Sequence, residues 1–364
     1  MSVNKYIISI HISRNNNFTG VFNNVAFPGF VAGNGDCITF TKQKITIVGK
    51  RSKKSKLDDI INNKKNSLYQ QIFKSLVYLY AANKRLITIR SIDIERFTSK
   101  TQDSKFTFTL KKHEQPIKNE FNLRYDLSDF IKDKIWEESS EANSIRTILT
   151  LWFSALSSND RFYIFERNWR TFERLCFYKS RAIAGVKEFD AIKNMKDYIC
   201  HNTHLFPDSL RIADKLSGRK LISFDWEGYI TNEFPTLSRS SKPRPYTEIY
   251  KNHLVICNTD IRIMNMLTKT LSIRKAELRR HGVYNDITNH ISTQISLRLK
   301  ANEQVLCILC CKYAYYLRNK MFHGEKPDFS FTFSDKTKDN LQIDILNYLF
   351  GNLINDLLLQ MNLL

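Results

Sequence analysis

The sequence predicts an α+β protein, with a β-rich N-terminal domain over residues 1–140 and an α-helical domain over residues 141–364. Three observations predict this. Apolar and polar residues alternate in several short segments before residue 140, as in strands that bury one face. Beyond it, apolar residues recur every three or four positions, as in amphipathic helices. The polar segment Glu137–Ser144 lies between the two patterns, and we take it as the domain boundary.

The N-terminal domain is expected to contain five strands and one helix. Alternation predicts a strand over Tyr6–Ser13, and the segment Cys37–Gly49 predicts two strands joined by a Lys-Gln turn. Apolar residues at helical spacing predict a helix over residues 66–82. Two further alternating segments, Arg85–Ile94 and Lys105–Lys112, return to strand.

The second domain is expected to be helical, because its apolar residues follow a period near 3.6. The segments with this spacing are residues 145–156, 161–178, 186–200, 258–277, 292–323 and 337–363. Residues 206–256 contain Pro207, Gly218 and Pro235 and mix both patterns. We interpret them as an insertion between helices.

The charge balance favours a polyanionic partner. The chain has 56 Lys and Arg against 36 Asp and Glu, a net charge of +20. A basic excess of this size favours nucleic acid, and RNA is the partner we expect. No segment has the roughly 18 uninterrupted apolar residues of a membrane span, and the N-terminal residues do not resemble a signal peptide. Seven cysteines without scaffold-like spacing indicate reduced thiols and a cytoplasmic protein.

The segment Tyr315–Glu325, "YYLRNKMFHGE", closes the predicted helix over residues 292–323. Asn319 and His323 are four positions apart and share a helix face, whereas Arg318 and His323 diverge by about 140°. Gly324 is a typical residue to follow a helix end. The chemistry of these side chains suits a nuclease, as set out below.

The same helix has apolar residues on two opposed faces. One stripe, containing Leu306, Leu309 and Leu317, would meet the core of its own domain. The second stripe consists of Ile308, Cys311, Tyr315 and Phe322. A helix with two apolar faces is buried on both. The second stripe therefore packs under residues 206–256 or meets a second copy of the chain.

RNA cleavage by the 2′-hydroxyl needs a base for that hydroxyl and an acid for the 5′-oxygen that leaves. A histidine side chain can play either part near neutral pH. An arginine suits the negative charge that develops on the phosphorane. Because the segment supplies one histidine per chain, a second copy at a two-fold interface would supply the missing acid or base.

The segment resembles the signature of the HEPN superfamily, in which Arg, a polar residue, a few further residues and His close one helix of a bundle. The helix over residues 161–178 resembles the first helix of that bundle, with Glu173 and Leu175 as its Glu-x-Leu element. The resemblance implies a metal-independent endoribonuclease without cofactors, acting as a toxin or antiviral defence effector and pairing as a homodimer through the helix that ends at His323.

The resemblance also implies the site residues. By position, Arg318, Asn319 and His323 form the catalytic set, and Glu173 supports them. Some members are silenced by modification of a tyrosine shortly after the histidine, but this sequence has "GEKPDF" there. The target RNA and any antitoxin or trigger protein are not identified by these residues.

Two basic clusters are expected to contact RNA phosphates. Their members are Lys50, Arg51, Lys53 and Lys54 in the first, and Arg274, Lys275, Arg279 and Arg280 in the second. The second cluster precedes His281 and is also open to interpretation as a second catalytic motif. Cys200, His201 and His204 have donor atoms for a metal, but a polar helix end is the reading we favour, and we predict no metal site. The alternative function is a non-catalytic RNA-binding or sensor protein.

Overall fold

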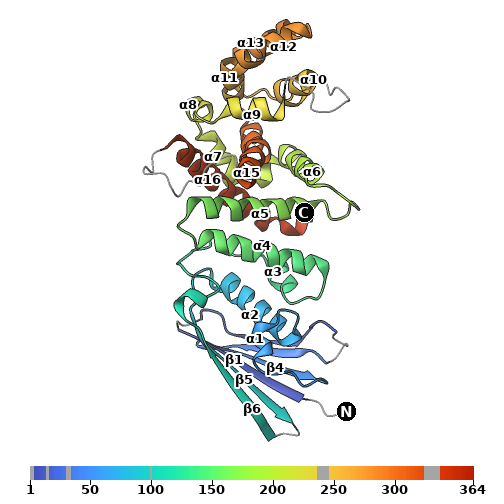
Figure 1. The fold of residues 1–364 in the computed structure, drawn as a ribbon, viewed down its shortest axis with the longest axis vertical. Helices are drawn as coiled ribbons and strands as arrows, with labels where there is room; N and C mark the ends of the chain where they lie inside the picture. The colour runs from blue at the N-terminus through green and yellow to red at the C-terminus, as the bar shows by residue number, and fades with distance from the viewer. Residues whose placement is uncertain (1–3, 14–15, 30–33, 99–100, 236–245, 324–336) are drawn as a thin grey trace. The chain divides into compact units, whose positions relative to one another are not determined.

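The computed structural model describes residues 4–13, 16–29, 34–98, 101–235, 246–323 and 337–364, and it confirms the α+β class (Figure 1). The chain divides into two compact units. Unit 1 consists of Met1–Tyr178 and Leu358–Leu364, and unit 2 of Lys179–Leu357. The division thus falls after Tyr178 and differs from the boundary expected at residues 137–144. Within the described ranges, no helix is long and apolar enough to cross a membrane.

Unit 1 contains a six-stranded antiparallel sheet with the order β2-β3-β4-β1-β5-β6. Its strands are β1 (Asn4–Ile12), β2 (Gly20–Val25), β3 (Asp36–Phe40), β4 (Lys44–Arg51), β5 (Ile89–Thr98) and β6 (Thr101–Thr109). The register places Ile8 of β1 opposite Ile47 of β4 and Ile94 of β5. Alternation predicted five of these strands. It missed β2, an edge strand whose Val21 side chain is 58% exposed.

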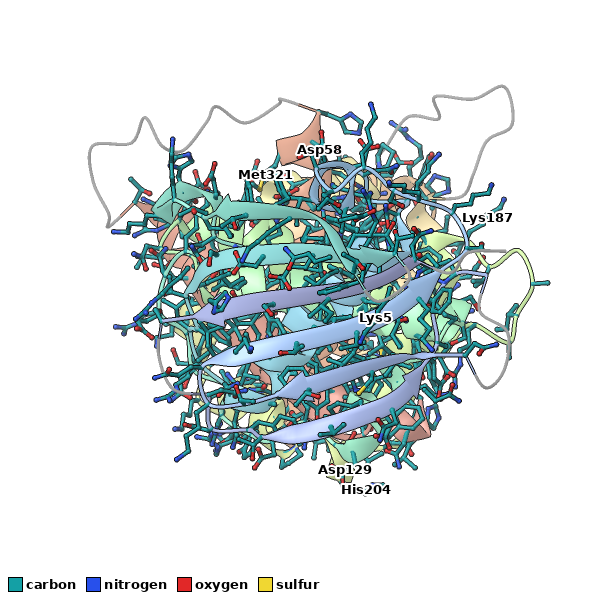
Figure 2. All side chains as sticks on the ribbon, turned by 90° about the horizontal axis from the view of Figure 1, so that it is seen from below. Lys5, Asp58, Asp129, Lys187, His204 and Met321 are labelled. Atoms are coloured by element: carbon teal, nitrogen blue, oxygen red, sulfur yellow. The ribbon has the colours of Figure 1, made fainter. Side chains whose placement is uncertain are left out.

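The two faces of the sheet differ in burial. Tyr6, Ile8 and Ile10 of β1 are fully buried, whereas Lys5 on the opposite face is exposed. Figure 2 looks onto this second face, with the strands in front. The buried face is covered by α2 (Ser67–Asn83), which contacts β4. The side chain of Asn66 caps α2 by accepting a hydrogen bond from the Leu68 N–H.

The other helices of unit 1 extend the layer formed by α2. They are α1 (Asp59–Asn62), η1 (Lys112–Glu114), α3 (Asp129–Lys134), α4 (Ser140–Leu156), α5 (Arg161–Lys179) and η7 (Met361–Leu363). Helix α4 packs on α2 and α3, and η7 packs on α3. Because α4 buries its apolar face against α2, the polar segment before it begins a helix of unit 1 and does not separate domains.

Unit 2 is helical throughout. Its elements are α6 (Glu188–His201), η2 (Thr203–Leu205), α7 (Pro207–Asp214), α8 (Gly218–Ile222), α9 (Trp226–Glu233), α10 (Tyr246–Tyr250), η3 (Lys251–Val255), α11 (Ile261–Thr270), η4 (Leu271–Arg274), α12 (Lys275–Arg280), α13 (Tyr284–Leu297), α14 (Asn302–Cys307), η5 (Ile308–Tyr313) and α15 (Ala314–Phe322), followed by α16 (Lys338–Leu359), which belongs to unit 2 up to Leu357. The described part of residues 206–256 therefore folds mainly as short helices.

The helix expected over residues 292–323 is interrupted. Helix α13 ends at Leu297, and Arg298 takes a left-handed conformation with φ of 52°. A second helical segment then runs from Asn302 to Phe322 through α14, η5 and α15, and η5 is a π-helix. A π-helical turn contains an extra residue and shifts the faces that follow it. The expectation of 100° per residue therefore fails after Ile308.

The burial of the second apolar stripe follows from this shift. Ile308 and Cys311 are buried in unit 2 and Tyr315 is partly buried, whereas Phe322 is 53% exposed. An aromatic cluster holds α15 from its other side: Tyr313 and Tyr316 pack edge-on against side chains of α9. The Tyr313 hydroxyl donates to Gln342 Oε1 of α16 over 2.9 Å. These contacts fix the direction of α15 and so the position of its last turn.

Candidate active site at the end of α15

The last turn of α15 brings together Arg318, Asn319 and His323. His323 is the C-terminal cap of the helix, and its N–H donates to the Asn319 carbonyl over 3.0 Å. The His323 side chain is exposed, and Arg318 and Asn319 are half-buried. An imidazole at a helix C-terminus is stabilised in its protonated form by the helix dipole. Gly324, which belongs to the predicted motif, lies outside the described residues.

Arg318 is held on three sides. Its Nη1 donates to Asn319 Oδ1 over 2.9 Å, and its guanidinium carbon lies 4.7 Å from the centroid of the Phe322 ring. Nη1 also lies 3.9 Å from Glu188 Oε1, which is too long for a hydrogen bond. In the described part of the chain, Arg318 Nε is buried and has no hydrogen-bond partner. The guanidinium is thus oriented but still has donors for an oxyanion.

Glu188 is a neighbour that sequence reasoning missed. It lies in the first turn of α6, where a helix N-terminus favours a carboxylate. Its Oε1 atom is buried, with no hydrogen-bond partner among the described residues, and faces Arg318 from a second helix. An acidic residue at the start of a predicted helix was the only signal available, and it does not reveal the partner 130 positions away.

Glu173, the fourth predicted catalytic residue, lies in unit 1. It is part of α5 (Arg161–Lys179), and Leu175 beside it is fully buried. Arg318, Asn319 and His323 lie in unit 2. Of the predicted catalytic residues, these three are the ones brought together on one helix.

The second basic cluster divides into one buried and three exposed residues. The expectation of Arg274 as an RNA contact is corrected, because its side chain is 2% exposed and its Nη1 donates to the Phe234 carbonyl. Its guanidinium carbon lies 5.3 Å from the Tyr250 ring, and burial lowers its pKa. An arginine held inside the unit in this way does not line a second catalytic site with His281.

The other three residues of this cluster are exposed on α12. Lys275 and Arg279 extend over the ring of Tyr284, at 6.0 and 5.1 Å from its centroid. Arg280 pairs with Glu277 over 3.1 Å but keeps 71% of its side chain exposed. These residues form a basic surface, which we call the α12 surface, and it is accessible to phosphates.

The first basic cluster is also mixed. Lys50 and Lys53 are exposed, and Lys54 is 60% exposed while it pairs with Asp103 over 3.3 Å. Arg51 instead makes a two-pronged ion pair with Asp36, with distances of 2.7 and 2.6 Å, and Asp36 is fully buried. Its guanidinium is therefore committed to the fold of unit 1.

Cys200, His201 and His204 do not gather around a common point. His201 Nδ1 lies 2.6 Å from the Asp197 carbonyl, and Cys200 Sγ lies 3.8 Å from Cys307 Sγ. Across the residues that the structure describes, no group of three or more His, Cys, Asp or Glu side chains is placed to hold a metal ion. No protein-family model, curated protein or solved structure matches the chain.

Proposed function

We propose that the protein is a metal-independent endoribonuclease of the HEPN type, which acts as a toxin or antiviral defence effector. The observation that carries the proposal is the last turn of α15, where an exposed imidazole lies beside an oriented guanidinium. Arg318 binds the scissile phosphate and stabilises the charge that develops on it. His323 transfers a proton to or from a ribose oxygen. Asn319 fixes the Arg318 side chain through its 2.9 Å hydrogen bond.

The reaction begins when a base removes the proton of the 2′-hydroxyl, which attacks the adjacent phosphorus. A phosphorane forms, and the bond to the 5′-oxygen breaks as an acid donates a proton to that oxygen. The products end in a 2′,3′-cyclic phosphate and a 5′-hydroxyl. His323 takes one of the two proton-transfer roles, and we assign the other to His323 of a second copy.

Pairing of two copies is supported by Phe322. This side chain is 53% exposed although it is large and apolar, and it lies against Arg318 at the end of α15. A two-fold axis beside Phe322 would bury both rings and set the two copies of His323 around one phosphate. Phe189, next to Glu188 in α6, is 69% exposed and adds apolar area to the same proposal.

The test is cleavage of RNA in the presence of EDTA, with His323→Ala and His281→Ala as a matched pair. His281 is also exposed, also caps a helix, and also precedes a glycine. We expect His323→Ala to lose at least about 100-fold of the rate, as for a lost acid or base. We expect His281→Ala to retain the wild-type rate. Full cleavage by folded His323→Ala, or strict dependence on Mg²⁺, would remove this assignment.

The alternative is a non-catalytic RNA-binding protein, and the exposed cations of the α12 surface are the observation that favours it. The same samples distinguish the two functions. Salt-dependent RNA binding by wild type with no cleavage products would support the alternative.

A further inference from the structure

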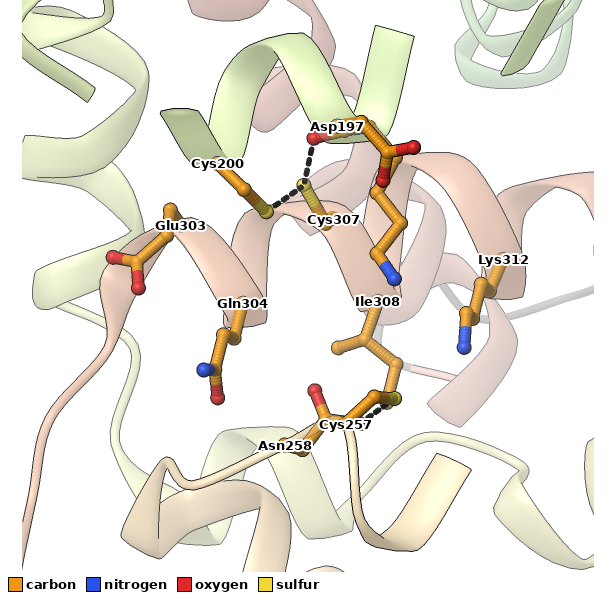
Figure 3. Close-up of a pocket in the computed structure, with 10 residues that line it drawn as sticks. Asp197, Cys200, Cys257, Asn258, Glu303, Gln304, Cys307, Ile308 and Lys312 are labelled. Carbon is orange, nitrogen blue, oxygen red and sulfur yellow. Dashed lines mark hydrogen bonds between the residues drawn. The ribbon is translucent and has the colours of Figure 1, made fainter. Parts of the chain in front are cut away.

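A cavity in unit 2 exposes a pair of thiols that the proposed reaction does not use. It has a volume of about 350 Å³, and its walls come from α6, from the helical segment of α14 and η5, and from the residues before α11. Cys200 of α6 and Cys307 of α14 both line it (Figure 3). Cys257 lines the same cavity from the third wall.

The two sulfur atoms point toward each other. Cys200 Sγ lies 3.8 Å from Cys307 Sγ, and neither is in a disulfide. Cys307 is 1% exposed, whereas Cys200 is partly exposed and gives the pair access from solvent. A disulfide has a sulfur–sulfur bond of about 2.05 Å. Each sulfur must therefore move by somewhat less than ~1 Å, which small side-chain rotations supply.

The surroundings keep the pair protonated in the resting state. The hydrogen bond with Cys307 raises the pKa of Cys200, and burial raises it further, whereas the nearby Lys196 lowers it. The Cys200 thiol lowers the pKa of Cys307, but Cys311 and burial raise it well above the ordinary value. Because the thiolate is the reactive form, the pair is stable until a strong oxidant reaches it.

We propose that Cys200 and Cys307 form a reversible disulfide when a hydroperoxide enters this cavity. The Cys200 thiolate attacks one peroxide oxygen, the O–O bond breaks, and Cys200 becomes a sulfenic acid while water or an alcohol leaves. Cys307, after losing its proton, attacks the sulfenic sulfur, and the hydroxide that leaves is protonated to water. Two thiols are oxidised by two electrons, and one peroxide is reduced.

The bond would restrain the two helices that form the candidate active site. Glu188, at the start of α6, faces Arg318, and α14 continues through η5 into the helix that carries Arg318. A disulfide between α6 and α14 holds Glu188 beside the guanidinium, where it competes with an RNA phosphate. Oxidation is therefore expected to slow RNA cleavage several-fold. This consequence rests on the proposed function, whereas the cross-link does not.

The experiment treats the reduced full-length chain with hydrogen peroxide, blocks remaining thiols, and maps the linked peptides by mass spectrometry without reduction. We expect a peptide joining Cys200 to Cys307 that dithiothreitol removes. Cys200→Ser should abolish it, and Cys257→Ser, which changes another thiol of the same cavity, should leave it intact. The wild-type map decides the matter even where a variant does not fold.

Two outcomes would overturn the proposal. One is oxidation of Cys200 to sulfinic acid without a link to Cys307, and the other is a link from Cys307 that persists in Cys200→Ser. RNA cleavage by the oxidised and reduced forms is measured in parallel. An equal rate for both forms would remove the regulatory consequence and leave the cross-link standing, and a lack of cleavage in both would count against the nuclease alone.

Discussion

Replacement of Arg318 by alanine tests the part of the mechanism that depends most on charge. The guanidinium is 26% exposed, so its electrostatic interactions are partly screened by solvent. Two unit charges about 4 Å apart interact by about 4 kcal/mol at an effective dielectric constant of about 20. If the phosphorane gains about one negative charge and exposure halves the interaction, the transition state loses about 2 kcal/mol, a rate decrease of roughly 30-fold.

The loss of the guanidinium fork adds to this electrostatic loss. Arg318 Nη1 donates to Asn319, so Arg318→Ala also frees the amide that orients the phosphate. A hydrogen bond to a charged group contributes about 1.5–3 kcal/mol. We therefore expect a total decrease of about 100-fold or more. Arg318→Lys keeps the charge but not the two-pronged geometry, and we expect an intermediate rate.

The assay is kcat/KM on a fluorescent RNA oligonucleotide in EDTA, with the thermal unfolding midpoint as a measure of folding. Arg280→Ala is the matched control, because Arg280 is also a helical arginine paired with a glutamate but lies on α12. The reasoning is refuted if folded Arg318→Ala cleaves at the wild-type rate. It is also refuted if Arg318→Lys and Arg318→Ala lose the same factor, since charge would then contribute nothing.

Three further predictions concern recognition, stability and assembly. Exchanging the exposed lysines of the first basic cluster for glutamine should flatten the salt dependence of RNA binding by up to ~0.7 per lost phosphate contact, measured by titration at several salt concentrations; an unchanged slope would mean that these lysines only contact solvent (Lys50, Lys53 and Lys54). Arg274→Ala should lower the free energy of unfolding by about 2 kcal/mol in urea titration because its bond to the Phe234 carbonyl is lost, whereas Arg279→Ala should weaken RNA binding without changing stability; the reverse pattern would contradict their assigned positions. Phe322→Glu should shift light-scattering mass toward the monomer, and wild type that is monomeric with RNA bound and fully active would exclude the paired site.

Local periodicity predicted most of the regular elements. The strands of the sheet interior and helices such as α2 and α5 follow patterns that the backbone geometry imposes on neighbouring residues. The strand β2 was missed because it lies at an edge and its exposed Val21 breaks the alternation. The helix over residues 292–323 was predicted as continuous because neither the left-handed Arg298 nor the π-helical turn changes the apolar spacing strongly.

The candidate site was only partly predictable for the same reason. Arg318, Asn319 and His323 are close in sequence, so helical geometry places them on one turn. Glu188 meets Arg318 through the packing of two helices far apart in sequence. The burial of Arg274 depends on Phe234 and Tyr250, which also come from other segments. Such contacts depend on tertiary structure, and short-range spacing does not contain them.

The return of the chain to unit 1 has a consequence for biosynthesis. Residues 358–364 belong to unit 1, and within them Met361 is fully buried and η7 packs on α3. A ribosome makes all of unit 2 between Tyr178 and this segment. Domains made early usually fold while later ones are still being translated. Here unit 1 must wait for η7, so an incomplete chain leaves the α3 surface uncovered, and unit 2 is the first unit whose whole sequence has been synthesised.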